Sequence, residues 1–552
     1  MAKGRNISKR EELAVTLIAL LALMTVTRAY YYTGPIFANS QDEAIYFNLL
    51  SGTAVFDRPF NFTAYRNANF SNATSVLFNP AEAHSFYVGM LYPEMFLLKT
   101  FGFSPTLAIS YIILNSLVEG AMLFFIVDLL WSRRAAIIGV VLLAFFPLDV
   151  LYSTHLQPLI PMVAMLSVSL YLFLLADRRI QKEKRNGKIL YLFSGFFAGL
   201  AFLVNPLALA FPVFLTLLFV FRFVTKKQKF SHMLAYGLIL LGAFSGYSIA
   251  GVVFLAQSGN FLLYPLAYHA VFPYQMHTQA YGTYNITNSV LLEYTDGSPF
   301  YYLPVIFDMP LYQYLPQLSY FSILTYVFAF ACVVLFIRRT KLIYLFIPMF
   351  IFFFLFIQLF PVALTYSNSI LRIYITNMEP YVTTILTLPM IIVVSIFLDS
   401  TLKMKRSYWK YAAYAIILLI LVFDVIDLNK DVAFYRDAMS TTNAFAAYVT
   451  ANPNGSYFSS NYLSDEVNVY TSYRYKVYDI WCNLSNAYMT SNSYVVIGGT
   501  ASVDLSPDVL ATFNTCAAAN LTGFRLVYTY KNRFANYIGS QYAPDLEIFQ
   551  KN

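Results

Sequence analysis

Two adjacent carboxylates, Asp42 and Glu43, stand in the stretch ANSQDEAIYFNLL. Ser40 and Glu43 have the S-x-x-E spacing of a capping box, in which both side chains satisfy backbone N–H groups at a helix start. This spacing predicts a helix that continues through Tyr46 and Leu50. The box gives Glu43 a structural role and leaves Asp42 without one. A carboxylate at a helix N-terminus is kept ionised by the helix dipole, which suits a general base or a ligand of a cation.

The composition indicates a membrane protein with many spans. The chain has 552 residues, of which 59% are hydrophobic and 12% charged, and its mean hydropathy is +0.58. A water-soluble globule cannot bury that much apolar surface. The net charge is +8, but the basic residues stand in short clusters between apolar runs rather than on one domain. This distribution argues against a nucleic acid as partner.

The basic clusters set the predicted topology, because loops rich in Lys and Arg stay in the cytoplasm. Apolar runs of bilayer-crossing length between them predict about eleven transmembrane helices, with the N-terminus cytoplasmic and the C-terminus outside. The runs lie near 13–32, 106–131, 135–152, 159–176, 189–205, 207–224, 232–256, 317–337, 342–361, 380–399 and 411–429. The first run ends without a small-residue cleavage site, so we expect an uncleaved anchor in the cell membrane rather than a signal peptide.

The predicted topology divides the chain into a membrane domain, 1–429, and an extracytoplasmic tail, 430–552. The first outer loop, 33–105, carries the acid pair. Its segment 84–103 is short and contains Pro93 and Glu94, so it is expected to be a helix along the interface rather than a span. In the tail, short β-type runs alternate with helical patterns, which is typical of a small α/β domain.

The tail also holds two cysteines, Cys482 and Cys516, whereas Cys332 falls within a predicted span. An even pair in an oxidising compartment favours a disulfide. Two small buried thiols are an equally weighted alternative.

Longer stretches follow the acid pair in a set order. DEAIY after the first span is followed by YPEMFLLKTFGF, then by GFFAGLAFLVNPLALAFPVFL, and late in the chain by LRIYITNMEPYVTTILTLP. In this order they resemble the lipid-phosphate-sugar-dependent glycosyltransferases of the GT-C class, in particular the protein O-mannosyltransferases and the aminoarabinose transferase of lipid A. The resemblance covers residues 10–230 and the late segment. The chain departs from the family at Gln157, where an acidic residue is common, and at Asn205, where a basic one is.

The resemblance implies a polytopic α-helical GT-C fold and an inverting glycosyltransferase. Such an enzyme moves a hexosyl or pentosyl group from a polyprenyl (dolichyl) phosphate donor to a hydroxyl acceptor on the outer face of the membrane. A lipid-carried donor also suits that compartment, which has no supply of nucleotide sugars. The acceptor, whether protein, lipid or glycan, is left open.

Inverting transfer needs a base for the acceptor's proton and cationic groups for the departing phosphate. Asp42 is the expected base. Arg372 is the expected phosphate clamp, with Tyr374 beside it, because a guanidinium matches phosphate oxygens bidentately. An Arg that anchors a helix at the interface is the structural alternative. Three further residues on the predicted outer side are candidate contacts to acceptor or sugar: His84, His155 and Gln157.

No cofactor follows from the sequence, although a divalent metal held by Asp42 and Glu43 is left open. The histidines show no spacing typical of zinc sites. Glu119 lies in the middle of a predicted span, where a charge suggests function. It is the residue that a lipid or glycan transporter or flippase, the second class considered, would use. A receptor or assembly subunit is the third class, and it predicts no consequence from losing Asp42.

Overall fold

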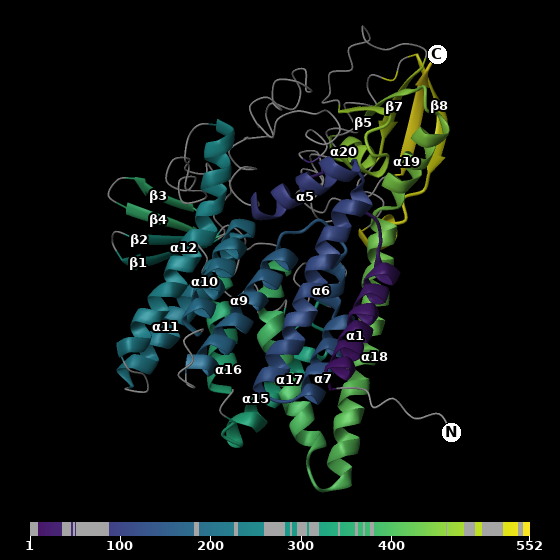
Figure 1. The fold of residues 1–552 in the computed structure, drawn as a ribbon. Helices are drawn as coiled ribbons and strands as arrows, with labels where there is room; N and C mark the ends of the chain where they lie inside the picture. The colour runs from purple at the N-terminus through teal and green to yellow at the C-terminus, as the bar shows by residue number, and fades with distance from the viewer. Residues whose placement is uncertain are drawn as a thin grey trace.

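The computed structural model describes residues 9–35, 46–47, 50, 88–180, 187–225, 230–258, 282–287, 290–294, 306–307, 320–340, 343–358, 363–367, 370–375, 380–459, 461–479, 492–498, 521, 523–538 and 545–552. Its helices form a bundle, and a β-sheet made of C-terminal residues lies beyond one end of it (Figure 1). Helix α1 (Lys9–Tyr31) ends on that side. The charge pattern predicts this end to be outside, and we call it the predicted outer end; the opposite end is the predicted inner end.

Seven helices in the described residues are long and apolar enough to cross a membrane, or eight if one bent pair counts as a span. They include α1, α6 (Pro105–Leu130), α9 (Leu159–Ile180), α10 (Gly187–Val204), α11 (Ala210–Val224) with η2 (Pro206–Leu209), α17 (Thr387–Leu402) with η3 (Pro380–Leu386), and α18 (Ser407–Ala438). The bent pair is α7 (Arg133–Phe145) and α8 (Pro147–Ser153). The chain is an integral membrane protein.

Three further helices contain shorter apolar stretches and overlap the remaining predicted spans. They are α12 (Phe230–Ser258), α15 (Leu324–Ile337) and α16 (Ile343–Gln358). The count of about eleven spans stays a prediction.

Local sequence signals mark several helix ends. Ser132 caps α7 by accepting a hydrogen bond from the N–H of Ala135 at 3.3 Å. Asn205, the departure from the family pattern, caps η2 by accepting from the N–H of Leu207 at 2.9 Å. Both are residue types that favour the N-cap position.

Helices α10 and α12 pack with their backbones in close approach. A Cβ atom on Gly195 or Gly199 would meet backbone atoms of α12 at 1.9 or 2.1 Å. A Cβ on Gly242 or Gly246 of α12 would likewise meet the backbone of α10 at 2.1 or 2.2 Å. Each helix therefore presents two glycines four residues apart, which lets the backbones touch, as in the small-residue interfaces of membrane proteins.

Helix α17 lies at the centre of the bundle, against α7, α15, α16 and α18. Its predicted inner end is held by Asp399, which pairs with Arg134 at 2.5 Å and Lys403 at 2.6 Å. The Trp131 indole also donates to Asp399 at 2.8 Å.

Two β-sheets stand outside the bundle. The first has the order β1-β2-β4-β3, with β2 (Val290–Tyr294) parallel to β4 (Ile370–Ile375) and with β1 (Gly282–Thr287) and β3 (Ala363–Ser367) as antiparallel partners. The second has the order β6-β5-β7-β9-β8. Its strands are β5 (Ser456–Ser459), β6 (Lys476–Asp479), β7 (Ser493–Ile497), β8 (Phe524–Tyr530) and β9 (Leu546–Lys551).

In the tail, β6, β7, β8 and β9 overlap the β-type runs YKVYDI, SYVVIGGT, FRLVYTYKN and LEIF of the sequence, in that order. Strand β5 matches none of these runs. Helices α19 (Ser440–Ala451) and α20 (Asn461–Tyr470) precede and follow β5, and the short α22 (Ala535–Ile538) follows β8. Helix α18 continues through the predicted boundary at 429/430. The division into two domains stays a proposal.

Helix α5 (Val88–Phe101) occupies the segment predicted to lie along the interface. It packs against α6 and α10 near the predicted outer end (Figure 1). Its buried positions Met90, Leu91, Glu94 and Leu98 recur at helical spacing, so one side of the helix faces the bundle.

Candidate functional site

The junction between α7 and α8 is bent by 61°. Pro147 begins α8 and has no N–H, and the N–H of Leu148 donates to the carbonyl oxygen of Tyr320 at 3.2 Å rather than continuing the helix. The carbonyl of Ala144 accepts instead from Nη1 of Arg28 at 3.2 Å. The break is therefore satisfied by two segments far away in the sequence.

Arg28 joins three helices at this break. Its side chain is fully buried and forms an ion pair with Asp149 of α8. Its Nε donates to Oγ of Ser116 on α6 at 3.1 Å, and the Ser116 hydroxyl in turn donates to Asp149 at 3.3 Å. Because a buried guanidinium is stable only when paired and hydrogen-bonded, this arrangement fixes the end of α1 against α6 and α8.

Glu119 lies one turn along α6 from Ser116 and is also fully buried. Neither of its carboxylate oxygens accepts a hydrogen bond from a donor in the described part of the chain, and its carboxyl interacts with that of Asp149. The cluster thus contains one guanidinium and two carboxyl groups. The sequence analysis proposed Glu119 as a functional candidate and missed Arg28 and Asp149. All three are charged residues inside predicted spans, which was the signal that could have found them.

His155 follows α8, outside the spanning helices, and is fully buried. Its Nδ1 lies 2.6 Å from the carbonyl oxygen of Leu151, which can only accept, so Nδ1 carries the proton. Nε2 then accepts from the hydroxyl of Thr33, 3.2 Å away and two residues past the end of α1. Burial lowers the pKa of His155 to about 4, so the imidazole is neutral at pH 7.

The acid pair of the sequence stands between two anchored points. Before it, Thr33 contacts His155; after it, Tyr46 and Phe47 are 4% and 0% exposed and belong to the main apolar core. Tyr46 and Phe47 are helical, as is Leu50, in line with the capping-box spacing. The predicted site residues Ser40, Asp42 and Glu43 themselves lie outside the described residues.

Known proteins resemble this chain in sequence and in fold. Residues 91–264 match a family model described as dolichyl-phosphate-mannose-protein mannosyltransferase. The structure is similar to ArnT from Cupriavidus metallidurans bound to undecaprenyl phosphate, with a TM-score of 0.57, 12% identity and 98% of each chain covered. The chain therefore has the GT-C fold.

Two further solved structures have the same fold. The apo state of the same ArnT gives a TM-score of 0.54 at 12% identity, with 98% of each chain covered. The oligosaccharyltransferase of Archaeoglobus fulgidus in complex with Zn and sulfate gives 0.51 at 11% identity, over 94% of this chain and 72% of that chain. No curated protein matches the GT-C chain in sequence at a significant level.

The expected phosphate residues of this GT-C protein lie on β4. The register pairs Arg372 with Leu291 of β2 and with Thr365 of β3, and Tyr374 with Glu293 of β2. The sheet therefore brings together two segments that are about 80 residues apart. The sequence did not predict these strands, and the phosphate role of Arg372 and Tyr374 stays a prediction.

The other predicted residues have mixed placements. Gln157 is buried, and its N–H donates to the carbonyl oxygen of His155 at 2.9 Å. Gln157 and His155 are covered in this structure, and a sugar contact by either stays a prediction. His84, Cys482 and Cys516 lie outside the described residues.

Glu94 of α5 is an additional buried acid that the sequence did not propose as functional. It is fully buried, and neither oxygen has a hydrogen-bond partner among the residues that the structure describes. Burial raises the pKa of this carboxyl well above its usual range. No group of three or more His, Cys, Asp or Glu in the described ranges could hold a metal ion. That search does not reach Asp42 and Glu43.

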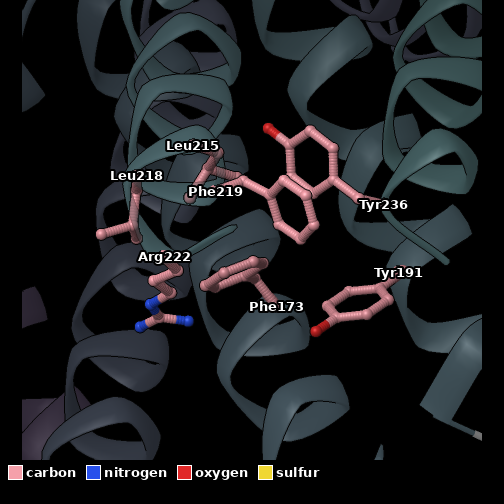
Figure 2. Close-up of a pocket in the computed structure, with 7 residues that line it drawn as sticks. All are labelled: Phe173, Tyr191, Leu215, Leu218, Phe219, Arg222 and Tyr236. Atoms are coloured by element: carbon pink, nitrogen blue, oxygen red, sulfur yellow. The ribbon is translucent and has the colours of Figure 1, made fainter. Parts of the chain in front are cut away.

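A pocket toward the predicted inner end is separate from this junction. Figure 2 shows it between α9, α10, α11 and α12. The rings of Phe219 and Tyr236 stack there at 4.6 Å, and Arg222 pairs with Asp177 at 3.6 Å. Tyr191 also donates to Asp177 at 3.2 Å. Because its polar groups satisfy one another, the pocket is a packing feature of these helices and not the candidate site.

Proposed function

We propose that this GT-C protein is an inverting glycosyltransferase that moves a sugar from a polyprenyl phosphate to a hydroxyl group on the outer face of the cell membrane. The observation that carries this proposal is the family-model match over 91–264, whose description names a dolichyl-phosphate-linked donor. The similar fold of an ArnT bound to undecaprenyl phosphate supports a lipid phosphate of the same chemical class. The sugar and the acceptor remain to be identified.

In the proposed reaction Asp42 acts as the general base. The acceptor oxygen attacks the anomeric carbon while its proton passes to the carboxylate of Asp42. The bond between that carbon and the phosphate oxygen breaks, and the polyprenyl phosphate leaves with the electron pair. The buried Tyr46 is four positions after Asp42, a stretch that spans at most about 14 Å when extended.

Arg372 is proposed to steady the phosphate as negative charge develops on it. A guanidinium can donate two parallel hydrogen bonds to phosphate oxygens. Support comes from β4 being an interior strand, paired on both edges by β2 and β3, which gives the residue a rigid backbone.

The transporter alternative gains no support from Glu119. That side chain is packed beside the Arg28–Asp149 ion pair and is fully buried, so it is part of a junction between helices. The transferase is therefore the one function that we propose.

The test is a membrane assay that offers polyprenyl-phosphate mannose, glucose and galactose and identifies the labelled product. Asp42→Asn keeps the side-chain shape but removes its basicity, so transfer should fall by about 100-fold or more. Glu43→Gln keeps a capping side chain and should have a milder effect, unless the pair binds a metal, in which case a chelator should mimic the loss.

Glu547→Gln on β9 is the matched control, since it removes one negative charge from the C-terminal sheet and should leave transfer unchanged. Absence of transfer from every offered donor by the wild-type protein would overturn the proposed activity. Near-normal transfer by a folded Asp42→Asn variant would instead remove only Asp42 from the reaction.

A further inference from the structure

We propose that Arg28 and Thr33 are positioning residues, which lock the end of α1 onto α8 and thereby set where the loop carrying Asp42 begins. This inference rests on the proposed function. It concerns residues that the sequence did not single out and that act through other groups rather than on substrate.

The first observation is the way in which Arg28 completes the broken helix. The bend before α8 leaves the Ala144 carbonyl outside the regular helix pattern, and Arg28 donates to it at 3.2 Å. The same guanidinium pairs with Asp149, on the other side of the bend. One side chain therefore bonds both halves of the break and holds their angle.

The second observation is a second bridge between the segment that contains Arg28 and the segment that contains Asp149. Thr33 follows Arg28 by five residues, and His155 follows Asp149 by six; the Thr33 hydroxyl lies 3.2 Å from Nε2 of His155. His155 is itself held by the 2.6 Å bond from Nδ1 to Leu151. Two bridges between two chain segments prevent both sliding and rotation, which a single bridge would allow.

The segment with the acid pair follows this junction directly in the sequence. Asp42 is nine residues past Thr33 and four residues before Tyr46, which is buried in the core. A general base must come within about 3 Å of the proton that it removes, and a misplacement of about 1 Å can cost as much as 100-fold in rate. A displaced start of the loop should therefore lower turnover with little effect on donor binding.

The chain offers a matched control at the opposite end of α7. Arg134 pairs with Asp399 at 2.5 Å and thereby ties α7 to α17 at the predicted inner end. Arg134→Lys makes the same chemical change as Arg28→Lys, but it does so away from the junction of α1 with α8.

The experiment compares Thr33→Val, Thr33→Ser, Arg28→Lys and Arg134→Lys in the full-length protein. Valine keeps the size of Thr33 and removes the hydroxyl, whereas serine keeps the hydroxyl. We expect kcat to fall about tenfold in Thr33→Val and Arg28→Lys, with KM for the lipid donor within about twofold of wild type. Thr33→Ser and Arg134→Lys should retain wild-type kcat. A thermal unfolding midpoint close to that of wild type shows that each variant is folded.

Hydrogen exchange of peptides covering residues 32–47 gives a readout that does not need activity. Exchange there should be faster in Thr33→Val and Arg28→Lys than in wild type, and unchanged in Arg134→Lys. If the wild-type protein transfers no sugar, the proposed function fails, and faster exchange in these two variants still supports the positioning role.

Wild-type kcat and wild-type exchange in folded Thr33→Val would overturn the proposal. Should Arg28→Lys fail to fold, the Thr33 variants decide, because their change is confined to one hydroxyl group. A tenfold loss in Thr33→Val that Thr33→Ser also shows would exclude the bridge to His155 as the cause.

Discussion

Arg28 of α1 and Asp149 of α8 form an ion pair whose side chains have no exposed surface. Glu119 places a second carboxyl beside the pair. Charge balance in this fully buried cluster requires one proton on the two carboxyl groups, because one guanidinium among the described residues faces them. Asp149 is therefore the ionised partner of Arg28, and Glu119 is the acid that keeps the proton.

Asp149→Asn should strongly destabilise the protein, since it breaks the buried ion pair of Arg28, a change that costs about 3–5 kcal/mol. Glu119→Gln should cost little, because the amide keeps the size of the side chain and supplies an N–H toward Asp149. Thermal unfolding midpoints in detergent distinguish the two variants. Equal destabilisation by both would contradict the proposed charge balance.

Gly199→Ala should separate α10 from α12, because its Cβ would lie 2.1 Å from the carbonyl oxygen of Ala243. Backbone atoms cannot move aside as a flexible side chain can, so we expect a loss of about 1–3 kcal/mol in the free energy of unfolding. Gly237→Ala in α12 is the control, since no described atom beyond the backbone of its own helix lies within 4 Å of its added Cβ. It should be neutral, or stabilise by up to about 1 kcal/mol through helix propensity. Equal losses in both variants would argue against the close approach.

Glu466 should make the stability of the tail depend on pH. Burial raises the pKa of this carboxyl to about 7, although the Thr442 hydroxyl, 2.5 Å away, opposes the shift. An unfolded chain loses this proton near pH 4.5 and the folded chain near pH 7, so the folded state binds more protons between these values. Stability should be greatest below pH 4.5 and should fall as the pH rises through 7, by at most about 1.4 kcal/mol per pH unit.

Glu466→Gln removes this titration and keeps an oxygen that can accept from Thr442. Unfolding midpoints measured from pH 5 to 8 should therefore fall less steeply in the variant than in the wild type. An identical slope in the two proteins would show that another group is responsible.

Arg372→Ala should weaken use of the lipid donor much more than it lowers the unfolding midpoint. Arg372→Lys should restore activity only in part, because lysine keeps the charge and loses the bidentate fork. Donor kinetics in membranes measure both variants. Wild-type kinetics in a folded alanine variant would remove Arg372 from the phosphate site.

Cys482 and Cys516 should be joined by a disulfide if the tail faces an oxidising compartment. Alkylation of denatured, non-reduced protein should then leave both unmodified, while Cys332, a free thiol in α15, serves as the internal positive control. Labelling of both tail cysteines would exclude the bridge.

The sequence could predict much of the element content. Apolar run length follows directly from bilayer thickness, and α1, α6 and α9 begin and end within a few residues of the predicted spans. The resemblance to the GT-C class was also visible in the sequence, because it depends on motifs and on their order along the chain. The small β1–β4 sheet was missed, because the parallel pairing of β2 with β4 joins strands about 80 residues apart and leaves no local signal.

The sequence by itself determined that this protein lies in a lipid bilayer, and it determined the order of the apolar helices. Both depend on composition along the chain. Only the tertiary structure decided which charged residues meet. Arg28, Ser116 and Asp149 are spread over more than 100 residues, and they come together because Pro147 breaks a helix and a buried guanidinium must find acceptors there. Such pairings arise from the packing of helices around one another, which no spacing along the chain records.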